Sequence, residues 1–163
     1  MFQNTATLAR AHRAGPIRAR AGTNLDVVAE GGSCRVAIVT KGHPFDAPAF
    51  LAVFDSIDGI EWTHVEHPYA LGLVEPATAA EFDVFVMYDM PGITFTGGDP
   101  PAEFPDPPSG YIEAFQRLLD EGKGMVFLHH AIAGWPAWEG YADIVGGRFH
   151  YQPATLDGIG YPD

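Results

Sequence analysis

The chain has 163 residues, of which 47% are hydrophobic and 18% are charged, a balance typical of one globular domain rather than a disordered segment. Its net charge is −12, and the four arginines among the first twenty residues, where no acid occurs, leave −16 on the remainder. An acidic body repels the phosphates of nucleic acids and anionic membrane surfaces, so neither is an expected partner. The sequence has no run of about 18 apolar residues that would predict a transmembrane helix.

Residues 1–33 differ from the rest of the chain, because they are rich in arginine and alanine and have no acid before Asp26. We expect a flexible N-terminal segment there and a folded domain over residues 34–163. The single cysteine, Cys34, excludes an internal disulfide and a cysteine-rich zinc site. This cysteine usage is consistent with a reducing, cytoplasmic setting.

Four short apolar runs predict strands, and helical patterns lie between them. The strands are expected at residues 35–40, 60–65, 83–88 and 125–128. Helices are expected at 48–54 after an Asp46 cap, at 78–82 as a short helix or turn, from a Ser109 cap to Leu119, and from Pro136 to Val145. The Pro- and Gly-rich loop over 93–108 is a candidate lid or substrate loop, and no further element is expected after Gly147.

Strands alternating with helices predict an α/β fold with a parallel sheet and right-handed crossovers. The strand order 2-1-3-4 is expected. It brings Thr40–His43, Asp89 and His129–His130 together, because each follows the carboxyl end of a neighbouring strand. Ligands of such sheets bind at this edge, so the sequence predicts a functional site there.

The adjacent histidines His129 and His130, at the end of the fourth strand, are the strongest candidates for catalysis, since imidazole exchanges protons near neutral pH. His43 lies in the loop after the first strand with Asp46 nearby, a carboxylate that either orients the imidazole or caps a helix. Asp89 is a candidate base, metal ligand or acceptor of sugar hydroxyls. Its competing interpretation is a turn before Pro91-Gly92.

Other residues have weaker assignments. Trp135 is a candidate platform for stacking a sugar ring, and His150 a candidate binding residue that returns towards the site. His64 and His67, which flank the end of the second strand, are expected on the surface or in structural roles. No cofactor is specified by these residues. An alternative is a divalent metal held by His43, one histidine of the pair and a carboxylate, although the spacing is no recognised metal motif.

Four segments together resemble the ThuA-like domain family of trehalose utilisation, which is related in fold to class I glutamine amidotransferases. They are residues 36–43 (VAIVTKGH), 82–92 (FDVFVMYDMPG), 122–131 (GKGMVFLHHA) and 146–149 (GGRF). The resemblance implies a flavodoxin-like three-layer sandwich and a small-molecule sugar or oxidised glycoside as ligand. It also implies that the domain is incomplete at its C-terminus and that its last strand is an exposed edge, so either this is a fragment or a partner, such as a second copy, covers that edge.

One departure from the amidotransferases concerns the nucleophile. Their cysteine lies on a sharp elbow after the strand that here ends in His129 and His130, while Cys34 lies at the start of the first strand. Hydrolysis of glutamine by a thiolate is therefore not expected. Two hypotheses follow: an enzyme of a sugar pathway that uses His43, Asp89 and His129 or His130, and a non-catalytic sugar-binding or assembly module on the same scaffold.

Overall fold

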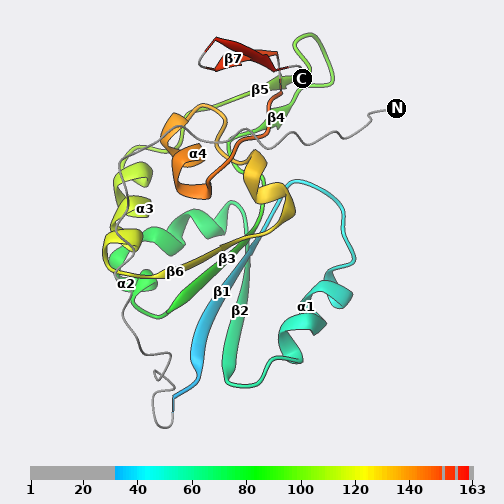
Figure 1. Cartoon of the computed structure of the whole chain (residues 1–163). Helices are drawn as coiled ribbons and strands as arrows, with labels where there is room; N and C mark the ends of the chain where they lie inside the picture. The colour runs from blue at the N-terminus through cyan, green and yellow to red at the C-terminus, as the bar shows by residue number, and fades with distance from the viewer. Residues whose placement is uncertain (1–31, 152, 157, 162–163) are drawn as a thin grey trace.

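The computed structural model describes residues 32–151, 153–156 and 158–161, and its centre is a parallel sheet of four strands (Figure 1). The strands are β1 (Cys34–Thr40), β2 (Ile60–Glu66), β3 (Val84–Tyr88) and β6 (Gly124–Phe127). Their order is β2-β1-β3-β6, and each neighbouring pair is parallel. The α/β class and the strand order that the sequence predicts are confirmed. The predicted segment 1–33 lies almost wholly outside the described residues.

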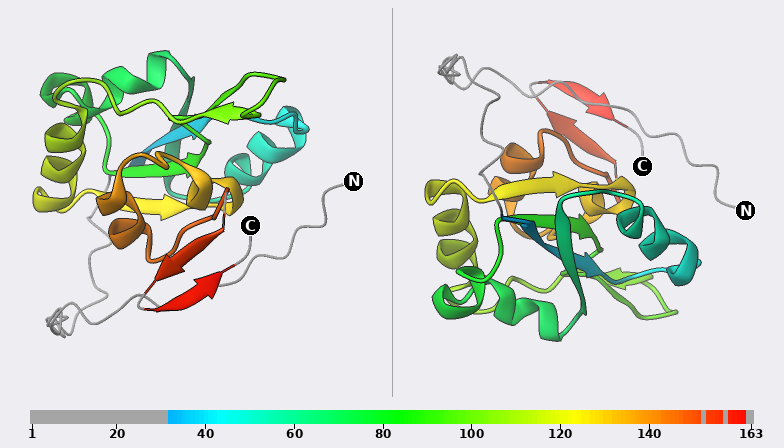
Figure 2. Two further views of the ribbon diagram at one scale, coloured as in Figure 1. Left: turned by 90° about the horizontal axis from the view of Figure 1, so that it is seen from above. Right: turned by 90° about the horizontal axis from the view of Figure 1, so that it is seen from below.

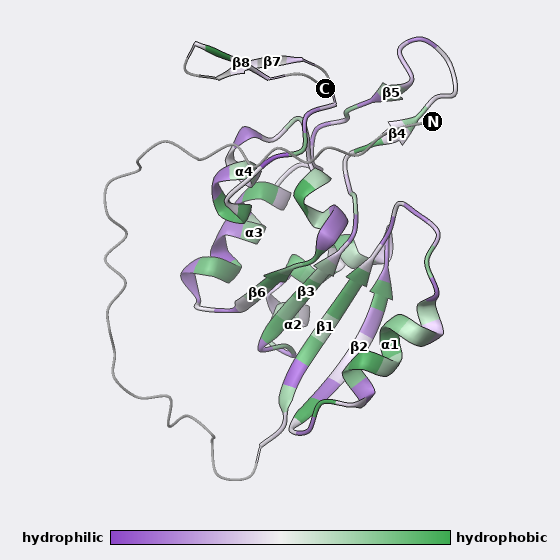
Figure 3. Ribbon diagram, turned by 45° about the vertical axis from the view of Figure 1, so that its right-hand side comes forward, coloured by the Kyte–Doolittle hydropathy of each residue, from purple (hydrophilic) through white to green (hydrophobic). Residues whose placement is uncertain are grey.

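Side chains of β1 are buried on both faces of the sheet, as expected for a central parallel strand. Val36 and Ile38 pack on one face together with Phe54, whereas Ala37 and Val39 join a larger apolar cluster on the other. Hydropathy mapped on the ribbon shows the same continuous apolar character along β1 and β3 (Figure 3). Both faces of the central strand β1 are therefore part of the core.

Helices cover the two faces unequally (Figure 2). On the face of Val36 and Ile38 lies α1 (Ala47–Asp55). The opposite face receives the 3-10 helix η1 (Tyr69–Val74), the short α2 (Pro76–Ala79) and α3 (Tyr111–Asp120). Val126 of the edge strand β6 points to the α1 side and is 42% exposed, so α1 does not cover this end of the sheet.

Two predicted helix starts are wrong. The residue before α3 is Gly110 and not the predicted cap Ser109. Gly110 has a φ of 78°, and this left-handed conformation is favourable only for glycine. The helix α4 (Glu139–Val145) begins three residues after Pro136, since the intervening chain makes a separate turn from Trp135. It ends at Gly146 in the left-handed conformation, as predicted.

Two small hairpins extend the chain beyond the sheet (Figure 1). The loop over 93–108 contains β4 (Thr94–Phe95) paired with β5 (Ala102–Glu103). The tail, where no element is predicted, contains β7 (Ala154–Leu156) and β8 (Ile159–Tyr161), joined through a turn at Gly158 with a φ of 78°. The expectation of an unstructured tail is wrong, because three-residue strands are too short to give an alternating pattern. Within the described residues, no helix is both long and apolar enough to cross a bilayer.

Candidate functional site

Three histidines from two strand ends meet at the carboxyl edge of the sheet. His43 follows β1, while His129 and His130 begin the 3-10 helix η2 (His129–Ala133) just after β6. The ring centroids of His43 and His130 lie 3.8 Å apart at an interplanar angle of 33°, and those of His129 and His130 also lie 3.8 Å apart, nearly perpendicular. The structure thus brings together three of the four residues predicted to be catalytic; we call them the histidine cluster.

Tyr88, the last residue of β3, connects the histidine cluster to the core. Its ring lies 5.1 Å from that of His43 and 6.3 Å from that of His129, centroid to centroid. The other side of the tyrosine packs against Phe50 of α1, with stacked rings 4.5 Å apart. The histidine cluster therefore packs against Tyr88, and Phe50 of α1 holds the Tyr88 ring in place. Sequence analysis missed Tyr88, although its place beside Asp89 at a strand end was a usable signal.

His43 has a defined tautomer in this geometry. Its Nδ1 lies 3.2 Å from the carbonyl oxygen of Pro44. Because a carbonyl oxygen only accepts, Nδ1 carries the proton and Nε2 carries the lone pair. That Nε2 is buried and has no hydrogen-bond partner among the described residues.

His130 is held in the neutral form. Burial, with smaller contributions from His43 and His129, lowers its pKa from 6.5 to about 4. Removing an imidazolium from water and placing it beside other imidazoles both disfavour the charge. At physiological pH His130 is therefore a proton acceptor, although a weaker base than an ordinary histidine.

His129 differs from its two neighbours in being exposed, and its backbone is strained. Its φ is 46°, in the left-handed region that side chains other than glycine seldom adopt. This residue forms the sharp turn from β6 into η2, so its imidazole projects from the edge of the sheet. Strain of this kind gathers at functional sites, where the surrounding structure maintains it.

Asp89, the fourth predicted catalytic residue, does not pair with the histidine cluster. Its Oδ2 lies 2.8 Å from Nε2 of His67, and the two side chains are 0% and 4% exposed. Successive residues of an extended chain point to opposite faces. Tyr88 packs on the α1 side, so Asp89 points to the side of α3. His67, which the sequence assigned to a surface or structural role, is the buried partner of Asp89.

Burial is the main influence on Asp89. It raises the pKa of this carboxyl group, while the hydrogen bond from His67 and the nearby Lys41 act in the opposite direction. The second oxygen, Oδ1, is buried and has no partner among the described residues. Asp89 is therefore bound to the core through His67 rather than placed to orient His43 or His130.

Asp46 and Trp135 have structural contacts. The Asp46 carboxylate accepts a hydrogen bond from the Ala49 amide at 3.1 Å, which makes it the cap of α1, one of the two predicted alternatives. Trp135 is only 5% exposed, and its ring packs against Tyr111 and over Gly92. The expected open platform for a sugar ring is not formed by Trp135, because its faces are already in contact with protein.

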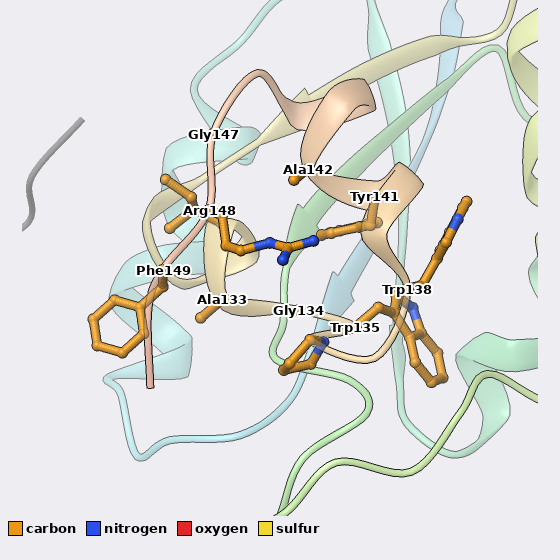
Figure 4. Close-up of a pocket in the computed structure, with 11 residues that line it drawn as sticks. Ala133, Gly134, Trp135, Trp138, Tyr141, Ala142, Gly147, Arg148 and Phe149 are labelled. Carbon is orange, nitrogen blue, oxygen red and sulfur yellow. The ribbon is translucent and has the colours of Figure 1, made fainter. Parts of the chain in front are cut away.

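A small pocket lies behind η2, between Trp135, Trp138, Arg148 and Phe149 (Figure 4). The Arg148 side chain extends along it toward Tyr141, and its guanidinium donates to the Glu139 carbonyl oxygen at 3.4 Å. His150 follows, and its ring stacks on Tyr161 of β8 with centroids 5.8 Å apart. The predicted binding residue His150 is thus in contact with the terminal hairpin.

Six buried side-chain polar atoms among the described residues have no hydrogen-bond partner, on His43, Asp89, Arg117, His130, Trp135 and His150. Five of the six belong to residues that the sequence singled out. Two of them, on His43 and His130, belong to the histidine cluster at the carboxyl edge of the sheet. An unsatisfied buried polar group costs about 1–3 kcal/mol, which a ligand bonded to these two nitrogens would recover.

The alternative of a metal centre gains no support from the described residues. Among them, no group of three or more His, Cys, Asp or Glu side chains is arranged to hold an ion.

No family model, curated protein or solved structure matches this chain. The assignment of a function therefore depends on the residues and geometry described above.

Proposed function

We propose that this chain is a ThuA-like domain that binds a sugar or an oxidised glycoside at the histidine cluster and transfers a proton to or from it. The proposal also assigns the sheet to the flavodoxin-like, amidotransferase-like three-layer class. The observation that carries it is the convergence of His43, His129 and His130 at the carboxyl edge of the sheet. This edge is where open α/β sheets bind their ligands.

In this proposal the three histidines have different tasks. His130 is the proton acceptor, because it is neutral at physiological pH. His43 stacks on it and fixes its orientation, while the exposed His129 contacts the ligand directly. Asp89 has no catalytic task here; with His67 it anchors the end of β3, and so the position of Tyr88 beneath the histidine cluster.

A second candidate is a sugar-binding or assembly module without catalysis. The observation that favours it is the absence of a thiol at the turn after β6, where His129 stands. Cys34 is the first residue of β1 and so lies at the amino edge of the sheet, opposite the histidine cluster. A module of this kind binds the same ligand and leaves it unchanged.

The test is calorimetric titration of the full chain with trehalose and with 3-keto-trehalose, followed by analysis of the same mixtures for product. Binding with turnover is expected, and His130→Asn should keep the affinity while lowering turnover by about 100-fold or more, the usual contribution of a positioned proton acceptor. His64→Asn, which alters a histidine outside the histidine cluster, is the matched control. Binding without turnover selects the module, and no binding of either sugar contradicts both proposals.

A further inference from the structure

The turn that carries His129 has the geometry of a nucleophile elbow. A strand, β6, ends at Phe127, and the 3-10 helix η2 begins two residues later at His129. Between them the chain turns through a φ of 46° at His129. A strained strand-to-helix turn of this form raises one side chain above the edge of the sheet, where a substrate reaches it and the flanking backbone does not hinder attack.

The side chain at this turn is a competent nucleophile. Imidazole forms covalent intermediates in enzymes through the lone pair of a neutral ring nitrogen. His129 is exposed, whereas His43 and His130 are partly buried, and it is therefore the ring of the histidine cluster that a substrate carbonyl reaches. Contacts to its ring come from the rings of His43, Tyr88 and His130.

A proton acceptor stands beside it. The ring centroid of His130 is 3.8 Å from that of His129, with the two planes perpendicular. His130 is neutral at physiological pH, since its pKa is lowered to about 4. Its Nδ1 is buried and has no partner among the described residues. An exposed nucleophile with a neutral base next to it is the arrangement that covalent acyl transfer uses.

We propose that His129 is a covalent nucleophile for acyl transfer, and that the chain hydrolyses activated carboxylic esters through an acyl-imidazole at this residue. This activity goes beyond the proposed action on sugars and does not depend on it. The histidine cluster supplies both steps, with His129 attacking the ester and His130 assisting the water that releases the acyl group.

The steps balance without any further reagent. A neutral ring nitrogen of His129 attacks the ester carbonyl carbon and forms a C–N bond, the C–O bond to the leaving alcohol breaks, and the alcohol departs as its anion. The other ring nitrogen of His129 then loses its proton to solvent. Water next attacks the acyl carbon while His130 accepts one of its protons. The C–N bond then breaks, His130 passes that proton to the departing nitrogen of His129, and the second proton of the water is lost to solvent as the carboxylate leaves.

The experiment uses p-nitrophenyl acetate with the full chain, following nitrophenolate release and locating the acetyl group by mass spectrometry after an acid quench. We expect an acetyl group on the peptide that contains His129. His129→Asn should abolish that adduct and reduce hydrolysis to the rate given by the same concentration of free imidazole. Asparagine is the suitable replacement, because it tolerates a positive φ and so preserves the turn.

Two further variants separate the roles. His130→Asn should slow the second step by about 100-fold, so the acetyl group accumulates on His129 and a burst of nitrophenolate precedes a slow phase. His64→Asn should leave the kinetics unchanged. Unaltered hydrolysis in His129→Asn, or an acetyl group found on another residue of the wild-type chain, overturns the proposal. The adduct is sought in the unmodified protein, so the test stands even where a variant fails to fold.

Discussion

Nε2 of His67 lies 2.8 Å from Oδ2 of Asp89, and the two side chains are 4% and 0% exposed. The contact joins the chain just after β2 to the chain just after β3 across the intervening strand β1. Because Tyr88 immediately precedes Asp89, this buried contact also fixes the position of Tyr88, against which the histidine cluster packs. We infer that the pair stabilises the conformation of the site and takes no part in its chemistry.

Breaking this pair from the His67 side should be costly. The variant His67→Ala leaves the Asp89 carboxyl group buried without a partner, and a buried polar group left unsatisfied typically costs about 1–3 kcal/mol of folding free energy. Urea unfolding measures the loss. The control is Asp83→Asn at the Arg35–Asp83 ion pair, whose side chains are each 46% exposed; its loss should be much smaller. Equal losses in the two variants contradict the assignment.

The low pKa of His130 predicts a dependence of stability on pH. The folded chain holds this imidazole neutral down to a pKa of about 4, whereas the unfolded chain binds a proton near 6.5. Between these values the unfolded state carries more protons, so this contribution to stability is complete above pH 6.5 and is lost as the pH falls towards 4. Unfolding curves measured across this range should show that the wild type loses stability more steeply than His130→Asn as the pH decreases.

The same property is visible by NMR. The ring protons of His130 should titrate near pH 4, and His130→Asn identifies their signal by its disappearance. A midpoint near 6.5 for that signal shows that the ring is solvated and removes the reason for assigning it as the neutral proton acceptor.

A buried tyrosine supports the segment that carries two of the histidines. The hydroxyl group of Tyr141 in α4 donates to the carbonyl oxygen of Ala131 in η2 at 3.1 Å, and the residue is 2% exposed. Tyr141→Phe removes this hydrogen bond, while the Gly134 amide still donates to the same carbonyl oxygen, so the loss should be that of one net hydrogen bond, about 0.5–1.5 kcal/mol. Thermal and urea unfolding measure it. Tyr69→Phe is the control, because Tyr69 is 82% exposed, and a loss of similar size there refutes the explanation.

Much of the fold was predictable, because β1 and β3 are short apolar runs whose burial on both faces requires central positions in a parallel sheet. The order of the four strands then placed His43 and the pair His129–His130 at one edge. The strand ends were correct to within one residue. Positions of this kind follow from backbone connectivity, which sequence patterns report well.

The direction of each side chain at that edge was harder to predict. Tyr88 and Asp89 are neighbours, and only one of them faces the histidine cluster. The end of β3 at Tyr88 was predicted, but the side of the sheet on which the histidines lie was not, so the alternation could not show which of the two residues faces them. The structural role of His67 was among the alternatives expected, but its pairing with Asp89 was not, because His67 follows β2 before Pro68 in a segment without regular spacing. Trp135 was assigned to a ligand, yet its φ of 43° turns its ring into the core over Gly92.

The contact between Gly92 and Trp135 gives a sharp test of this packing. Gly92 has a φ of 74°, and a Cβ atom there would lie 2.6 Å from Cε3 and 3.1 Å from Cα of Trp135. Gly97 has a similar φ of 70° but open space around the same position. Gly97→Ala should therefore lose only about 1–2 kcal/mol from the left-handed backbone, whereas Gly92→Ala also displaces the indole and should lose clearly more. Urea unfolding of both variants separates the backbone effect from the steric one. Equal losses would show that the Trp135 ring moves freely aside, and that the turn between η2 and α4 is not fixed by this contact.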